Sequence, residues 1–254
     1  MRRIYRRQCP CPTDWRDRVE RSIPDYPEFC KQATAFEALP LNSPERRDGF
    51  AAFAPHVLVK KKSGKPDFPA IWGKHKETIA VMSFQKCVYC EGPINALRAS
   101  HVEHFKPKAV FPLLAYEWTN YFLGCAGCNG AKAHHWPERG GYLRPDQGDP
   151  SRHFVFEADG TVTAVKAGSA ADRTLTDLDL KRQWLVNRRR FNIEAMMRLL
   201  DYAVLRYRNG DKAEANQLAR IILRNVSDPA AAYSAALEQH FWRVWKAACP
   251  KAKV

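Results

Sequence analysis

The chain has 254 residues, with 41 lysines and arginines against 27 aspartates and glutamates, and a formal net charge of +14. A chain of this length can bury a sizeable core as one domain or as two packed lobes. No run approaches the roughly 20 apolar residues of a membrane span, and no apolar segment follows the basic opening MRRIYRR, which argues against a secretory signal. We therefore expect a cytoplasmic protein without membrane contact. The basic balance favours a polyanionic partner.

Residues 1–84 form, by composition, a mixed segment that is rich in proline, with a basic arm at its start and a basic loop at 60–65. Residues 69–84 predict a helix that leads into the next segment. Cys9 and Cys11 fit either a third metal half-site or free thiols. Cys30 and Cys249 have no paired spacing, and free thiols are the simpler interpretation of both.

Two CxxC pairs frame the centre of the chain, Cys87 with Cys90 and Cys125 with Cys128. Two such pairs supply four thiolates in the tetrahedral arrangement that structural zinc prefers. Gly92, next to the first pair, suits the tight turn of a zinc knuckle. The gap between the pairs leaves room for a β-hairpin. Redox-active pairs and buried thiols are the alternatives, but a matched double pair is the zinc pattern.

The residues between the pairs suit phosphodiester hydrolysis, which needs an activated water and a metal with open positions. Glu103 is a hard oxygen ligand of the kind that Mg²⁺ or Mn²⁺ prefers, and His104 is a base that titrates near neutrality. Adjacent strand residues point to opposite faces, so one site for both requires a bend after His104, for which Pro107 is well placed. Asn129, at the expected start of a short helix, offers an amide oxygen to the metal. Lys132, one turn later, is expected to face a phosphate.

Other polar side chains around this motif have secondary roles. Lys106 and Lys108 are expected to contact the phosphate backbone. His134 or His135 is a candidate third metal ligand, and a solvated or phosphate-facing histidine is the alternative. His101 is expected to face away from the metal and to have a structural role.

The segment EHFKPK, followed by WTNYFLGCAGCNGAK, resembles the HNH, or ββα-metal (His-Me finger), nucleases. In that pattern an acidic residue and a histidine end the first strand, a middle asparagine pins the loop, and a final histidine or asparagine lies on the helix. Glu103, His104, Asn120 and Asn129 match these positions in order. The resemblance implies that His104 is the general base, that Glu103 and Asn129 hold the metal, and that Asn120 orients the loop carrying the base. Glu103 stands where Asp is usual, and Asn129 where the final His is usual.

A second resemblance covers most of the chain. The segments MRRIYRR, CVYCEG, HVEHFKPK, LRPDQGDPSRHFVFEADG and LTDLDLKRQWLVNRRR resemble the PtuB-like HNH subunit of Septu-type and retron-associated anti-phage systems. Members of that group act with a partner ATPase, so the resemblance implies a PtuA-like partner subunit.

Past the nuclease-like segment, a short hairpin is expected. The predicted turn is Asp159-Gly160. Phe154 and Phe156 belong to the strand before it, and Val162 and Val165 belong to the strand after it.

The C-terminal third is predicted to be helical. One apolar stripe with helical spacing comprises Met196, Leu199, Leu200, Ala203, Val204 and Tyr207. The aromatic cluster of Phe241, Trp242 and Trp245 belongs either to a core or to a docking surface, and core is the commoner placement.

Residues typical of helix ends and helix starts divide this C-terminal third into separate helices. Gly210 is expected to end the first helix, and Asp211 with Glu214 predicts a capping box for the next. Asp228-Pro229 predicts the start of the last helix, and Pro250 follows its end.

Together these features predict an α+β protein with a zinc-knuckle-stapled ββα-metal nuclease core. The expected parts are a mixed N-terminal segment (1–84), the core (85–150), the β-hairpin (151–171) and a helical region (172–254) that is a candidate for partner docking. The expected activity is that of an HNH endonuclease acting on DNA in an anti-phage complex, with structural Zn²⁺ and catalytic Mg²⁺ or Mn²⁺.

Two alternatives stay open. One is an RNase of the same chemistry, such as a tRNA-cleaving abortive-infection toxin. The other is a zinc-dependent module that binds nucleic acid without catalysis, against which Glu103, His104 and Asn129 argue.

Overall fold

The computed structural model describes residues 1–94, 100–252 and 254. The chain divides into two compact units, which we call the site unit (Tyr5–Gln85 and Ile94–Tyr142) and the helical unit (Met1–Ile4, Lys86–Pro93 and Leu143–Val254). The boundaries expected from the sequence divide the chain differently. The hairpin expected at 151–171 belongs with the C-terminal helices, because α7 (Ala170–Asp177) packs on β6 (Val162–Ala164) and α10 (Ser234–Ala248) packs on β5 (Phe154–Phe156).

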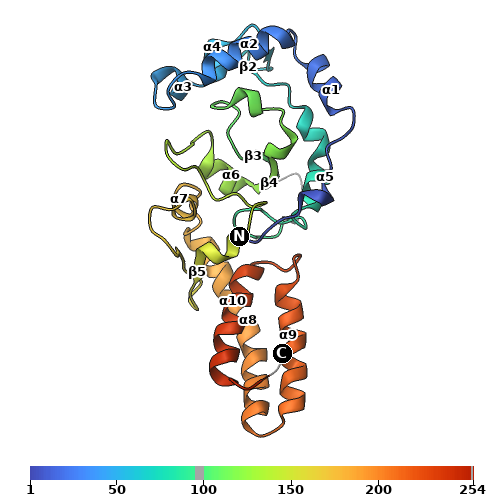
Figure 1. Ribbon diagram of the computed structural model, residues 1–254, viewed down its shortest axis with the longest axis vertical. Coiled ribbons are helices and arrows are strands. Elements are labelled where there is room, and N and C mark those ends of the chain that lie inside the picture. The colour runs from blue at the N-terminus through green and yellow to red at the C-terminus, as the bar shows by residue number, and fades with distance from the viewer. Residues whose placement is uncertain (95–99, 253) are drawn as a thin grey trace. The chain divides into compact units, whose positions relative to one another are not determined.

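The site unit combines short helices with two antiparallel hairpins, β1–β2 and β3–β4 (Figure 1). Its elements in chain order are η1 (Arg6–Gln8), α1 (Trp15–Ser22), α2 (Tyr26–Glu37), α3 (Pro44–Asp48), α4 (Phe50–Phe53), β1 (Val59–Lys60), β2 (Pro66–Asp67), η2 (Ile71–His75), α5 (Lys76–Val81), β3 (Ser100–His104), η4 (Pro112–Leu114), η5 (Trp118–Asn120), β4 (Tyr121–Cys125) and α6 (Ala126–Lys132). The expected mixture of helix and sheet is therefore present.

The helix expected over 69–84 is split into a 3₁₀ turn, η2, and the α-helix α5. Gly73, within η2, disfavours one regular helix over the whole segment. Trp72 and Ile79 are buried, and α5 packs on both β3 and β4. The segment thus supports the strands that carry the motif residues.

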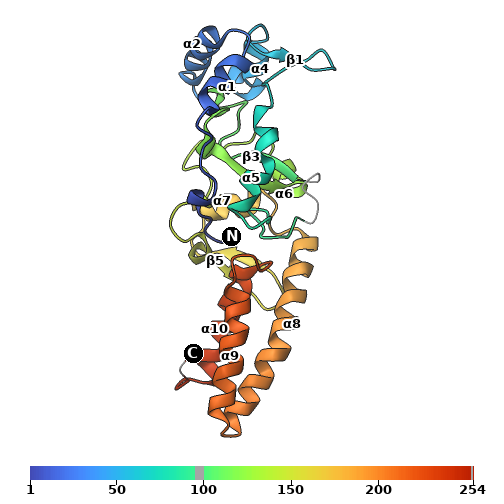
Figure 2. The same cartoon turned by 90° about the vertical axis from the view of Figure 1, so that its right-hand side faces the viewer.

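The helical unit holds a short hairpin and a group of long helices. In Figures 1 and 2, α8, α9 and α10 run side by side along most of their length, and all three pairs are in contact. Its remaining elements are η6 (Pro150–His153), β5, β6, α7, α8 (Gln183–Arg208), α9 (Lys212–Ser227) and α10. Phe241 and Trp245 are buried here, which confirms core as their environment, whereas Trp242 of the same cluster is half-buried.

The hairpin and the end of α8 follow the sequence prediction. β5 pairs antiparallel with β6, and the turn between them contains Gly160 at φ 84°. A side chain at Gly160 would lie 2.1 Å from the carbonyl oxygen of Val186, so this position requires glycine for space as well as for conformation. Gly210, at φ 95°, follows the end of α8.

One helix-start prediction holds in part, and the other is wrong. Helix α9 begins directly after Asp211, its N-cap, as predicted, but the capping box does not form. The Asp211 side chain makes no capping bond to α9, because Asp211 and Glu214 both pair with Arg206, at 3.1 and 2.5 Å. The last helix begins at Ser234 rather than near Pro229. The Asp228 carboxylate instead accepts from the Ala230 amide at 2.7 Å and closes a separate turn.

Helix α8 carries apolar residues on two opposite faces. Met196, Leu200 and Val204 are buried in the bundle, as expected, but Leu199 of the predicted stripe is 63% exposed. The exposed face, which we call the α8 stripe, also includes large side chains that are 50–63% exposed. They are Trp184, Phe191, Tyr202 and Leu205. A helix that is apolar on both sides is normally covered on both sides.

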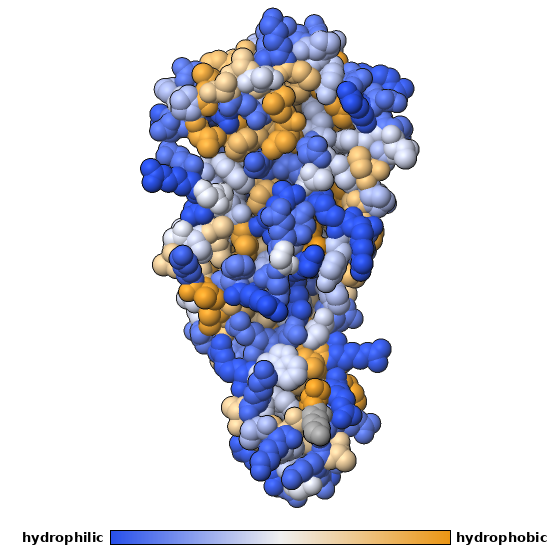
Figure 3. Space-filling view, in the orientation of Figure 1, coloured by the Kyte–Doolittle hydropathy of each residue, from blue (hydrophilic) through white to orange (hydrophobic). Residues whose placement is uncertain are grey.

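Elsewhere the surface is mainly polar. Figure 3 shows hydrophilic residues over most of one face, with apolar patches near the end that holds α2–α4. Phe53 and Leu39 line an apolar groove there and are 46% and 37% exposed. Within the described residues, no helix is both long enough and apolar enough to cross a membrane.

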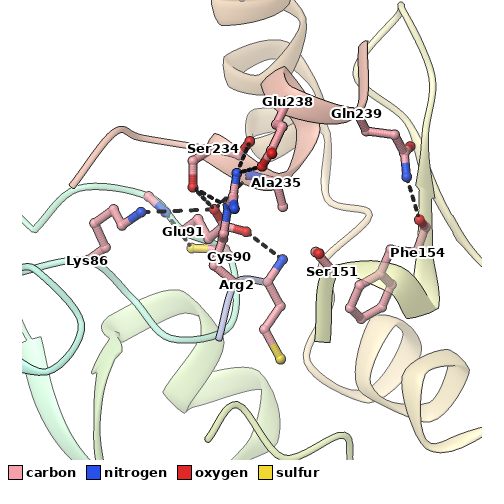
Figure 4. A network of polar contacts seen from close by, with 12 residues as sticks. Arg2, Lys86, Cys90, Glu91, Ser151, Phe154, Ser234, Ala235, Glu238 and Gln239 are labelled. Atoms are coloured by element: carbon pink, nitrogen blue, oxygen red, sulfur yellow. Dashed lines mark hydrogen bonds and ion pairs between the residues drawn. The ribbon is translucent and has the colours of Figure 1, made fainter. Parts of the chain in front are cut away.

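A buried carboxylate, Glu91, organises the loop that carries the first cysteine pair (Figure 4). It accepts hydrogen bonds from the Ser234 hydroxyl at 2.9 Å and the Ala235 amide at 3.1 Å, and it pairs with the Met1 ammonium at 2.6 Å. Burial by itself would raise its pKa, but the Met1 ammonium and Lys86 outweigh burial and hold the pKa at about 2. Glu91 also adopts the left-handed φ of 59°, so the tight turn expected at Gly92 lies one residue earlier.

Replacing this carboxylate tests its contribution to stability. Glu91→Gln removes the charge and leaves buried cations unpaired, so we expect the free energy of unfolding to fall by roughly 3 kcal/mol. Because the folded pKa lies below the ordinary 4.5, wild-type stability should decline as the pH falls from 4.5 towards 2, and the variant should decline less over that window. Urea titrations across this pH range measure both effects.

Glu238→Gln is the matched control, since Glu238 pairs with Arg2 at a partly exposed position. We expect it to cost no more than about 1 kcal/mol. Equal losses for the two variants would contradict the role of Glu91.

Candidate active site

The four cysteines of the two CxxC pairs converge. Their Sγ atoms all lie within 4.8 Å of one another, and three of the four residues are buried. A tetrahedral zinc with Zn–S bonds of ~2.3 Å separates its sulfurs by ~3.8 Å, so the cluster fits such a site. Backbone amides also point at these sulfurs: the Gly92 amide lies 3.4 Å from Cys90 Sγ, and the Cys128 amide 3.5 Å from Cys125 Sγ.

The second pair also begins helix α6. Cys125 is its N-cap and Cys128 lies in its first turn. The helix therefore starts at Ala126, three residues before the expected start at Asn129, and it ends at Lys132 because Ala133 turns to φ 45°. Asn129 and Lys132 are held on this short helix directly after the cysteines.

Strands β3 and β4 pair over five residues, from Ser100 opposite Cys125 to His104 opposite Tyr121. A side chain at Gly124 would lie 3.3 Å from Glu103 Cβ and 3.6 Å from Asn129 Cβ. The absence of a side chain at Gly124 therefore lets Glu103 on β3 and Asn129 on α6 approach each other across β4.

Lys132 is a buried partner of Glu103. Its ammonium lies 2.5 Å from Glu103 Oε1 and donates to the His104 carbonyl at 2.8 Å, and both side chains are at most 2% exposed. This differs from the phosphate-facing position expected for Lys132. The spacing contained a signal: Lys132 follows the buried Cys128 by four residues and so shares its inward face of the helix.

His104 lies in an aromatic pocket at the end of β3. Its ring meets Trp72 and Tyr121 edge-on, with centroids 4.6 and 5.1 Å apart. Its Nε2 donates to the Ala115 carbonyl at 3.0 Å, so in the neutral ring the lone pair is on Nδ1. Burial first, and then the charge of Lys108, lower the pKa of His104 to about 3, which keeps the imidazole neutral.

Asn120 fastens the loop that follows His104. Its Oδ1 accepts from the Lys106 amide at 2.8 Å, and its Nδ2 donates to the carbonyls of Lys106 and Leu114 at 2.9 and 3.0 Å. The loop turns at Pro107, whose carbonyl accepts from the amides of Val110 and Phe111. These bonds fix the chain direction immediately after the strand.

A cleft of about 340 Å³ brings most of the predicted residues together. Its lining includes Glu103, His104 and Asn129, together with Lys108 and two further histidines, His101 and His134. His101 thus lies at the cleft rather than facing away from it. Between the two candidates for a third ligand, His134 lines the cleft, whereas His135 Nδ1 lies 2.7 Å from the Tyr142 hydroxyl.

The two remaining basic residues have local partners. Lys108 pairs with Asp67 at 2.7 Å and lies over the Phe68 ring, and burial lowers its pKa. Lys106 lies over the rings of Phe111 and Trp136. Sequence reasoning missed Asp67, and it missed Trp72 as the wall behind His104; neither position carries a pattern that identifies it.

No protein-family model matches the chain, and no solved structure matches it. The chain is similar to Septu protein PtuB of Bacillus thuringiensis, with 37% identity over 88 residues, which is 34% of each chain. It is also similar to Septu protein PtuB of Bacillus mycoides (strain KBAB4), with 26% identity over 144 residues, or 45% of this chain and 49% of that one. The similarity therefore spans less than half the length of both curated relatives.

The cysteine cluster predicts a zinc dependence of folding. Cys128→Ser should lower the melting temperature and reduce bound zinc, because metal-binding free energy is folding free energy in such sites. Wild-type protein should hold about one zinc per chain by elemental analysis. Cys11→Ser, at an exposed cysteine outside the cluster, is the control and should change neither quantity. Wild-type protein prepared without chelators and found free of zinc would contradict the assignment.

Proposed function

We propose that the protein is a metal-dependent endonuclease that hydrolyses phosphodiester bonds and acts in a Septu-type anti-phage defence system. The observation that carries the chemistry is the shared cleft, lined by a carboxylate, Glu103, a neutral imidazole, His104, and an amide, Asn129. The similarity to Septu protein PtuB supports the biological setting. DNA is the favoured substrate, and RNA is the alternative within the same chemistry.

In this proposal His104 acts as the general base. Its Nε2 is held by the Ala115 carbonyl, which leaves Nδ1 to accept the proton of the attacking water. Trp72 and Tyr121 fix the plane of the ring. Asn120 holds the loop next to the base and is a positioning residue, since its bonds go to backbone atoms of Lys106 and Leu114.

The donor set of the cleft fits a hard divalent cation. Glu103 uses Oε1 for Lys132 and has a second carboxylate oxygen, and Asn129 contributes an amide oxygen. Mg²⁺ is commonly held by one or two protein oxygens while waters and substrate phosphates complete its shell. Within the described residues, the cysteines form the one group of three or more His, Cys, Asp or Glu side chains with converging ligand atoms, so this site relies on such a mixed shell. The bound ion would stabilise charge on the leaving oxygen.

Substitutions in the cleft test the proposal. His104→Ala should lower the cleavage rate by ~10²–10⁴ in protein that is still folded and still holds zinc, because a general base acts in the transition state. Glu103→Ala and Asn129→Ala should lose activity through weaker metal binding, so raised Mn²⁺ should partly restore it. Plasmid DNA and total RNA, each incubated with Mg²⁺ or Mn²⁺, measure the rate and the substrate class.

His153→Ala, a histidine of the helical unit outside the cleft, is the matched control and should keep full activity. Folded His104→Ala protein that cuts nucleic acid at the wild-type rate would overturn the endonuclease assignment. The module that binds nucleic acid without catalysis would then be the better interpretation.

We also propose that a PtuA-like ATPase subunit docks on the helical unit through the α8 stripe. The support is the resemblance to the PtuB-like group together with five large apolar side chains on one helix face that are at least half exposed. The aromatic residues Trp184 and Phe191 in this stripe are of the type that dominates protein interfaces.

This surface can be tested without disturbing the fold, because the stripe lies opposite the buried face of α8. Phe191→Ser with Leu199→Ser should abolish co-purification of the ATPase encoded by the neighbouring gene and leave the melting temperature unchanged. Ile221→Ser on α9, also 51% exposed, is the control and should retain the partner. Undiminished co-purification of the double variant would place the interface elsewhere.

A further inference from the structure

A second cleft of the site unit lies apart from the catalytic residues. It has a volume of about 400 Å³ and is formed by α1, the residue before it and η2. The residues that line it are Asp14, Arg18, Arg21, Ser22, Ile71, Lys74 and His75. We propose that this cleft, which we call the α1–η2 cleft, binds a phosphate group of the nucleic-acid strand that the active site cuts.

The charge of the cleft favours an anion. Three cationic side chains, those of Arg18, Arg21 and Lys74, face one carboxylate, Asp14. Arg18 Nε donates a hydrogen bond to the Asp14 carboxylate at 2.6 Å, and Arg21 Nε donates one to the Asp17 carbonyl at 3.1 Å. A guanidinium has five N–H donors, so both arginines keep terminal nitrogens that can bind phosphate oxygens as a fork.

The shape of the cleft is set by segments far apart in the sequence. Arg18 and Arg21 are three residues apart, which places them on one face of α1. The opposite wall is His75, whose ring meets Trp15 and Trp118 edge-on at 5.3 and 5.4 Å. Burial and then the charge of Arg18 lower the pKa of His75, so the ring is a neutral wall and the positive charge comes from the longer side chains. Packing of α1 against η2 therefore holds the basic residues around a defined space.

The position of the cleft fits a strand that continues from the active site. Trp72 lines the catalytic cleft and packs on His104, and His75 lines the α1–η2 cleft; both belong to η2. The two clefts therefore share one short helix, η2. The inference rests on the proposed nuclease function and adds where the uncut part of the substrate is held.

The test measures binding of nucleic acid apart from cleavage. In a His104→Ala background, Arg21→Ala with Lys74→Ala should weaken binding of a 20-nucleotide single strand at least tenfold. The slope of log K against log salt should become shallower by ~1.4, because each phosphate contact on a single strand contributes ~0.7. Arg220→Ala with Arg224→Ala, two exposed arginines of α9, remove the same charge and should change both quantities by less than half as much.

Different failures point to different errors. If His104→Ala protein binds no nucleic acid, the proposed nuclease function fails. If it binds, and the Arg21/Lys74 pair behaves like the Arg220/Arg224 pair, the α1–η2 cleft is not a phosphate site of the strand. ATP and inorganic phosphate, each tested at roughly 1 μM–1 mM, distinguish a small ligand from the strand. If either one binds the wild-type protein but not the Arg21/Lys74 variant, and that variant still binds the strand, the cleft serves a small phosphorylated ligand. The strand proposal is then overturned.

Discussion

The antiparallel pairing of β3 with β4 is the constraint on which the candidate site depends. Its register sets Ser100 opposite Cys125 and His104 opposite Tyr121. Cys125 is at once the last residue of β4 and the N-cap of α6, so the same register fixes where the helix begins. A slip of one residue would turn every β3 side chain to the other face. Glu103 would then no longer lie next to Gly124 or next to α6, the helix that carries Asn129.

A dry environment sets the chemistry of His104. Aromatic rings on two sides and the bond to the Ala115 carbonyl select one neutral tautomer. Desolvation lowers the pKa, and therefore the strength of the imidazole as a base. Because the imidazole is already neutral, it can accept a proton without first losing one, and the surrounding contacts fix its orientation. In the proposed mechanism, His104 therefore depends on geometry more than on basicity to activate water.

Spacing in the sequence predicted the local features of the fold, and the structure adds those that depend on distant residues. The cysteine pairs, the hairpin around Gly160 and the end of α8 at Gly210 follow from turn chemistry and ligand spacing, which act over a few residues. The start of α10 could not be predicted from Asp228-Pro229, because Asp228 closes a turn of its own.

For the candidate site, the motif gave the residues but not their surroundings. Its positions named Glu103, His104 and Asn129, which share a cleft. The motif did not give the burial of Lys132, because its pairing with Glu103 depends on how α6 lies on β3. The motif also did not indicate Trp72. This residue contacts His104 although it lies about thirty positions earlier in the chain, and only the tertiary fold brings the two together.

The net charge of +14 says less about where a polyanion binds than the pairing of individual cations does. Lys132 and Lys108 lie at the candidate site, but each is paired with a carboxylate, Glu103 and Asp67 respectively. Their charge is largely offset before any substrate arrives. The α1–η2 cleft has cations in excess of carboxylates, at a solvated position where attraction to phosphate carries a low desolvation cost. Under the proposed function, affinity for the strand and cleavage of the strand are therefore expected to depend on different residues.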